Sequence, residues 1–198
     1  MQRDKIIALV MAAGYSRRFG AADKREAVLG DGRSLLIASL ANARGTFSSL
    51  RVVVRKEDAP TGIEECALIR VKGARHGLGA SIGEAFGTLL EDTSVSDIQA
   101  AAVLLGDMPY IQRGTFTALM DMSAPNIIVS PSIEERPGHP VLFGRDFWPA
   151  LARLSGGDGA KAVLQANAAH HRVCPVNDRG IQWDIDTPEA LEKPFSTR

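Results

Sequence analysis

The chain has 198 residues, of which 45% are hydrophobic and 23% are charged, and its 23 basic and 23 acidic side chains give a formal net charge of zero. These proportions are ordinary for a globular protein, and the zero net charge excludes the basic field typical of proteins that bind nucleic acid or an anionic membrane. No apolar run is long enough to span a bilayer. We therefore expect one domain over residues 1–198, with neither nucleic acid nor membrane as a partner.

Two features bear on the compartment of the protein. Cys66 and Cys174 lie far apart without metal-ligand spacing, which predicts free thiols in a reducing cytoplasm. A secretory signal is the alternative, because Arg3 and Lys5 precede an apolar run over residues 6–13. No convincing cleavage site follows that run, so we expect a cytoplasmic protein.

Apolar, β-branched segments alternate with helical patterns along the whole chain. This alternation predicts an α/β fold with a mostly parallel sheet covered on both faces, whose ligands bind beyond the carboxyl ends of the strands. The expected strands are 5–11, 50–55, 67–71, 100–105, 126–129, 141–143 and 172–176, and the expected helices are 34–44, 79–91, 113–122, 144–154 and 159–167.

The first expected strand leads into a loop of small residues and cations. Ala12, Ala13 and Gly14 leave the backbone bare, so a base or a phosphate can approach its N–H groups, and Arg17, Arg18 and Lys24 add positive charge. The loop has neither the Walker A spacing nor the dinucleotide fingerprint. It predicts a nucleotide site of a third kind, against the alternative of an ordinary loop with solvated arginines.

Carboxylates follow two other apolar segments. Asp107 comes directly after the strand 100–105, between Gly106 and Met108-Pro109, where it could hold a divalent cation or cap a turn. Asp184 and Asp186 are two residues apart, so an extended backbone would point both to one side. A plain helix cap by Asp186 or Thr187 is the alternative there.

Two further loops are candidate ligand contacts. Gly77 and Gly79 precede an expected helix, whose N-terminus favours anions. His139 stands between Gly138 and Pro140, and these rigid flanks suit a defined contact, although a lone loop histidine is often structural.

Together these segments resemble one family. Ala12-Ala13-Gly14-x-Ser16-x-Arg18-Phe19-Gly20-x-x-x-Lys24, Gly77-Leu78-Gly79-Ala80-Ser81-Ile82, Gly106-Asp107-Met108-Pro109, Gly138-His139-Pro140-Val141, Gly157-Asp158-Gly159-Ala160 and Asp184-Ile185-Asp186-Thr187-Pro188-Glu189 occur in that order. The chain is similar to the MobA-like nucleotidyltransferases, and most to the molybdenum cofactor cytidylyltransferases.

The resemblance implies a three-layer α/β/α Rossmann-like nucleotidyltransferase fold with a mostly parallel mixed sheet, and Mg²⁺-dependent transfer of CMP from CTP to the phosphate of molybdopterin. Its expected partners are these two substrates and a molybdenum hydroxylase or its chaperone. Ala12, Ala13 and Gly14 would contact the base and favour cytosine. The expected catalytic residues are Arg18, Lys24 and Asp107, the expected metal ligands are Asp107, Asp184 and Asp186, and the other residues expected around the nucleotide or the pterin phosphate are Gly79, Ser81, Gly106 and His139.

One spacing departs from the family pattern. Three residues separate Gly20 from Lys24 where the family usually has two, and Arg25-Glu26 follow where it usually has apolar residues. We therefore expect Lys24 to be displaced. The alternatives are another phosphate acceptor or GTP, a reductase of small heteroaromatic substrates, and a non-catalytic carrier of the cofactor.

Overall fold

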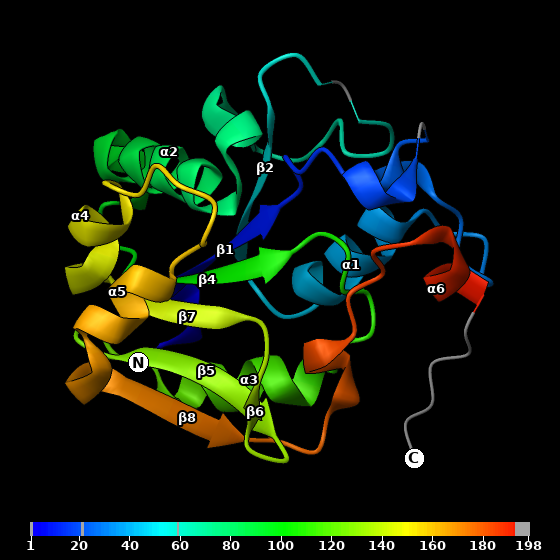
Figure 1. Cartoon of the computed structure of the whole chain (residues 1–198). Helices are drawn as coiled ribbons and strands as arrows, with labels where there is room; N and C mark the ends of the chain where they lie inside the picture. The colour runs from blue at the N-terminus through cyan, green and yellow to red at the C-terminus, as the bar shows by residue number, and fades with distance from the viewer. Residues whose placement is uncertain (1, 21, 59, 193–198) are drawn as a thin grey trace.

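An eight-stranded mixed sheet forms the centre of the molecule (Figure 1). The computed structural model describes residues 2–20, 22–58 and 60–192, with the side chains of Arg17 and Glu192 outside that description. The strands are β1 (Ile6–Met11), β2 (Ser49–Arg55), β3 (Leu68–Val71), β4 (Ala100–Leu105), β5 (Ile128–Ile133), β6 (Arg136–Pro137), β7 (Val141–Gly144) and β8 (His171–Pro175). The α-helices are α1 (Leu35–Arg44), α2 (Leu78–Glu91), α3 (Arg113–Met122), α4 (Trp148–Leu151), α5 (Lys161–Ala166) and α6 (Pro188–Glu192).

The strand order is β3-β2-β1-β4-β7-β5-β6, and β8 pairs with β5. The strands β1 to β4 are parallel to one another where they pair, and β8 is parallel to β5, whereas β7 is antiparallel to both β4 and β5. The prediction of an α/β fold with a mostly parallel mixed sheet is therefore confirmed.

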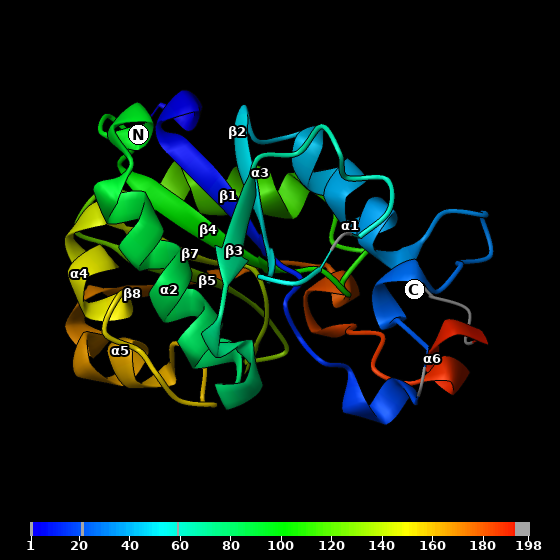
Figure 2. The ribbon, with the colours of Figure 1, turned by 90° about the horizontal axis from the view of Figure 1, so that it is seen from above.

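Alternate residues of each central strand serve two separate cores. In β1, Ile6, Ala8 and Val10 pack with α1 and α3, while Ile7, Leu9 and Met11 pack with α2, α4 and α5. This alternation follows from the two-residue repeat of a strand, and it makes the run apolar throughout because both faces are covered. Figure 2 shows these two groups of helices on opposite sides of the sheet, which gives the three layers.

Three element boundaries differ from the sequence prediction. The strand expected over 126–129 runs from Ile128 to Ile133 and continues through Pro131, a residue that sequence rules exclude from most paired strands. The helix expected over 144–154 contains only a 3-10 turn (Arg145–Phe147) and α4, because Gly144 still pairs in the sheet and Pro149 restricts the helix to a start near itself. The helix expected from 159 begins at Lys161, since Gly159 has a φ of 59° that no α-helix accepts.

The C-terminal segment returns to the N-terminal loop. Ile185 is fully buried against Leu29, Leu35 and Ala38, and residues of α6 pack on the same small core. Figures 1 and 2 agree in placing α6 beside the segment that follows β1. None of the helices in the described segments combines the length and the apolar character that crossing a membrane requires.

Candidate active site

A cleft of about 510 Å³ opens at the carboxyl ends of β1 and β4. It lies where ligands bind in open α/β sheets. Side chains and backbone from the loop after β1, from the turn before α2 and from the C-terminal segment surround it. Its lining includes Ala13, Gly14, Tyr15, Ser16, Arg18, Lys24, Arg75, His76, Gly77, Ser81, Asp107, Asp184 and Asp186.

The ends of three parallel strands are joined at the floor of this cleft. The amide of Ala12 donates to the Val53 carbonyl at 2.8 Å, and the amide of Gly106 donates to the Met11 carbonyl at 3.0 Å. A Cβ atom at Gly106 would lie 3.1 Å from that same carbonyl oxygen, so the glycine permits the close approach. Ala12 and Gly106 line a small recess that continues the cleft.

A buried arginine supports the loop after β1 from below. The Arg25 guanidinium donates from Nη1 to the Ala12 carbonyl at 3.1 Å and to Asp58 Oδ2 at 2.5 Å, and from Nε to Asp23 Oδ1 at 2.9 Å. Only 10% of its side chain is exposed. Burial opposes its charge, but the two carboxylates outweigh that effect and raise the pKa of Arg25. Arg25 therefore fixes the backbone at the end of β1.

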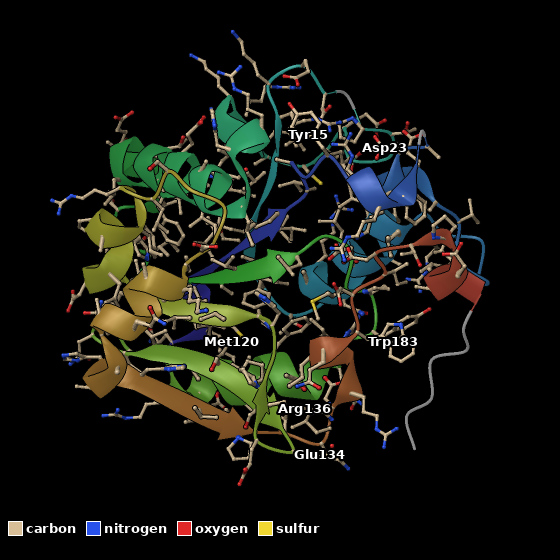
Figure 3. All side chains as sticks on the ribbon, in the orientation of Figure 1. Tyr15, Asp23, Met120, Glu134, Arg136 and Trp183 are labelled. Atoms are coloured by element: carbon tan, nitrogen blue, oxygen red, sulfur yellow. The ribbon has the colours of Figure 1, made fainter. Side chains whose placement is uncertain are left out.

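Asp58 links that arginine to a second one. Its Oδ1 accepts from Arg55 Nε at 2.9 Å, while Arg55 Nη1 donates to the Gly14 carbonyl at 3.4 Å and its guanidinium lies 4.6 Å from the centre of the Tyr15 ring. Figure 3 labels Tyr15 and Asp23, which lie at the same end of the molecule. Sequence analysis noted Arg25 only as a departure from the family pattern and missed Arg55 and Asp58, because nothing local in the sequence connects them.

Lys24 lies between two carboxylates in the cleft. Its Nζ donates to Asp107 Oδ2 and to Asp186 Oδ1, both at 2.6 Å, and only 6% of its side chain is exposed. Arg18 contacts the other oxygen of Asp186 at 2.5 Å from the rim, where 76% of its side chain is exposed. The three residues expected to be catalytic, Arg18, Lys24 and Asp107, are thus brought together, and the longer spacing before Lys24 does not keep it out of the cleft.

The C-terminal carboxylates reach the site through a backbone contact. The amide of Ile185 donates to the Asp107 carbonyl at 3.1 Å, which places Asp184 and Asp186 on either side of that contact. Burial and the neighbouring charges of Asp186 and Asp107 raise the pKa of Asp184. Burial opposes ionisation of Asp186 as well, but the hydrogen bond and charge of Lys24 outweigh it and lower the pKa of Asp186.

The carboxylates suit a cation that is completed by substrate. Within the described part of the chain, no three His, Cys, Asp or Glu side chains gather closely enough to hold a metal ion by themselves. Mg²⁺ usually takes one or two carboxylates and fills its shell with water and phosphate oxygens. Asp107 and Asp186 fit that requirement, and Asp107 Oδ1 is buried without a hydrogen-bond partner among the described residues.

The turn before α2 contributes backbone and one hydroxyl. Gly77, with a φ of 109°, and Ser81 line the cleft. Gly79 does not line it: a Cβ there would lie 2.5 Å from the Gly156 carbonyl oxygen, and that oxygen accepts from the Ala80 amide at 3.0 Å. The expectation of an open anion site at this helix start therefore fits Gly77 better than Gly79.

His139 belongs to a second cavity, of about 440 Å³, that shares Leu78 with the cleft. This cavity is mostly apolar, and its polar groups include Ser130 and His171, whose Oγ and Nε2 atoms are 2.8 Å apart. His139 Nδ1 is buried without a partner in the described structure. Burial lowers the pKa of His139, and the charge of Asp107 opposes that shift.

Comparison with known proteins agrees with this geometry. The family model described as "MobA-like NTP transferase domain" matches residues 8–173. The chain belongs to the MobA-like NTP transferase family, and it is an enzyme of the nucleotidyltransferase class. A search of curated proteins gives no match.

Solved structures share the fold along almost the whole chain. A homologue of Rv0371c from Mycobacterium sp. strain JC1 is 27% identical, with a TM-score of 0.79 over 96% of this chain and 95% of that one. Rv0371c of Mycobacterium tuberculosis H37Rv, in a complex with manganese, is 24% identical, with a TM-score of 0.71 over 94% and 96%. A nucleotidyl transferase from Methanothermobacter is 15% identical, with a TM-score of 0.73 over 94% of each chain. The last two likenesses show the fold.

Proposed function

We propose that this protein transfers CMP from CTP to the phosphate of molybdopterin, releasing pyrophosphate and forming molybdopterin cytosine dinucleotide. The observation that carries nucleotidyl transfer is the Lys24 ammonium between Asp107 and Asp186 at the ends of β1 and β4. Cations and carboxylates side by side suit a reaction that is catalysed by positioning and charge neutralisation.

The residues divide the work between two substrates. The bare backbone at Ala13 and Gly14 receives the nucleotide, and the cations Arg18 and Lys24 bind its phosphates in the cleft that they line. Asp107 and Asp186 would hold Mg²⁺, which when bound neutralises charge on the triphosphate. The manganese in the Rv0371c structure supports a divalent ion in this fold.

The acceptor fits the second cavity. Its apolar walls suit a flat ring better than a sugar, and His139, Ser130 and His171 offer a few polar contacts for ring heteroatoms. An oxygen of the acceptor phosphate attacks the α-phosphorus of CTP, and the bond from that phosphorus to the β-phosphate bridging oxygen breaks. The attacking phosphate is already ionised at neutral pH, so the site needs no general base.

The test is turnover with each nucleotide. The protein is incubated with Mg²⁺, molybdopterin and one nucleoside triphosphate at a time, pyrophosphate is measured, and the product is identified by mass. We expect a cytosine dinucleotide from CTP alone. Activity only with GTP or only with a sugar phosphate would replace the substrate assignment, and consumption of NAD(P)H without any nucleotide dependence would refute the class of reaction.

A further inference from the structure

Lys24 occupies the place between two oxygens that a cation would share. Its ammonium lies 2.6 Å from one oxygen of Asp107 and 2.6 Å from one oxygen of Asp186, and its side chain is almost completely buried. We infer that in the protein without nucleotide the Lys24 ammonium holds the cation position between Asp107 and Asp186, so that a divalent metal enters only as a nucleotide draws Lys24 away.

The two cations exclude each other at short range. A Mg²⁺ ion needs its ligand oxygens at about 2.0–2.1 Å in octahedral order. An ammonium in contact with the same two oxygens fills the space between them and repels the incoming charge. Metal binding to Asp107 and Asp186 therefore requires Lys24 to leave.

The carboxylates are built to accept a further partner once Lys24 has moved. Asp107 Oδ1 is buried and has no donor among the described residues, although buried acceptors are usually satisfied. Arg18 holds the outer oxygen of Asp186 from an exposed position, so it keeps one countercharge at the site without filling the centre.

Lys24 has somewhere to go. It lines both the cleft and the adjoining recess, and its flexible four-carbon stem lets the ammonium turn from a carboxylate to a phosphate without backbone movement. A triphosphate in the cleft offers Lys24 new anionic partners and offers the metal new oxygen ligands. By thermodynamic linkage, nucleotide must then raise the affinity for metal by the same factor as metal raises the affinity for nucleotide.

The inference rests on the proposed function only for a divalent ion and a nucleoside triphosphate as ligands. Its main test contains no nucleotide. Mn²⁺ is titrated into wild type and into Lys24→Met, and free Mn²⁺ is counted by electron paramagnetic resonance. We expect Lys24→Met to bind Mn²⁺ at least ~10-fold more tightly, about 1.4 kcal/mol. Lys24→Arg, which keeps the charge, and Lys56→Met, at an exposed position outside the site, should bind like wild type.

A double variant locates the binding. Lys24→Met with Asp107→Asn should lose the affinity that Lys24→Met gains, because one of the two ligands is gone. If folded Lys24→Met binds Mn²⁺ no more tightly than wild type, the exchange is refuted. Lys24→Gln repeats the comparison with a polar neutral side chain, in case the methionine variant does not fold.

Wild type supplies an independent measurement. In the presence of the non-hydrolysable α,β-methylene analogue of CTP, its affinity for Mn²⁺ should rise at least ~10-fold, and this gain should shrink in Lys24→Met. An analogue that binds without changing the affinity of wild type for Mn²⁺ would overturn the inference. An analogue that does not bind at all, when tested by calorimetry, would count against the proposed function, while the nucleotide-free comparison still decides the role of Lys24.

Discussion

Neutralising Asp58 should destabilise the protein and loosen the nucleotide loop. Its carboxylate, 8% exposed, receives Arg25 Nη1 at 2.5 Å and Arg55 Nη2 at 2.8 Å. In Asp58→Asn these two guanidinium groups face each other across an amide that carries no charge. Asp23 still pairs with Arg25, so the loss should fall below the 3–5 kcal/mol of a fully broken buried pair.

We expect a loss of about 2–3 kcal/mol, which for a chain of this length lowers the Tm by about 4–12 °C. The effect depends on pH with a defined sign. Burial opposes the charge of Asp58, but the two arginines outweigh it and lower its pKa. Its contribution to stability is therefore present above the unfolded pKa of about 3.9 and is lost as the pH falls through the folded pKa. The difference between wild type and variant should be full at pH 7 and narrow below about pH 4.

Thermal unfolding followed by circular dichroism measures this directly. Asp31→Asn is the matched control, because Asp31 also pairs with an arginine, Arg33, but with both side chains about half exposed. Its Tm should stay close to that of wild type, since exposed ion pairs contribute little. Equal Tm values for wild type and Asp58→Asn at pH 7 would refute the reasoning, as would a difference that grows in acid.

Three further predictions concern the site and its supports. Asp107→Asn should lower pyrophosphate release at least ~100-fold with little change in Tm, because the side chain is an acceptor for Lys24 and no core residue depends on it; a variant with near wild-type turnover contradicts its role. Gly77→Ala should cost about 1–3 kcal/mol in chemical denaturation, since its φ is 109° and a Cβ would lie 2.6 Å from the Gly157 Cα; an unchanged denaturation midpoint would show that the loop yields freely. Ala160→Trp, which fills the second cavity, should raise KM for the acceptor at least ~10-fold and leave the Kd for CTP within about twofold; weaker CTP binding instead would assign that cavity to the nucleotide.

Much of the fold follows from local patterns in the sequence. The strand Ala100–Leu105 and the helix Arg113–Met122 have the predicted bounds, because a fully apolar run and a clear helical pattern depend little on what packs against them. The β5–β6 hairpin was not predicted. Its strand runs through Pro131, which is tolerated because of its place in the sheet, and sequence rules alone do not supply that place.

The candidate residues divide in the same way. The loop after β1, Asp107 and the Asp184-Ile185-Asp186 segment were found from residue type, spacing and family resemblance, and these are properties that a sequence carries in order along the chain. The sequence did not indicate that Gly79 would face the Gly156 carbonyl instead of the cleft, since that depends on a loop about 77 residues away.

The sequence alone establishes a strand that delivers small residues and cations to a ligand, and carboxylates at the ends of two later segments. Only the tertiary structure brings Lys24 into contact with Asp186, 162 residues further along the chain, and joins Arg25 to Arg55 through Asp58. The physical reason is that periodicity and turn chemistry act over a few residues, whereas these contacts form only after β1 and β4 pair and Ile185 is buried beside them.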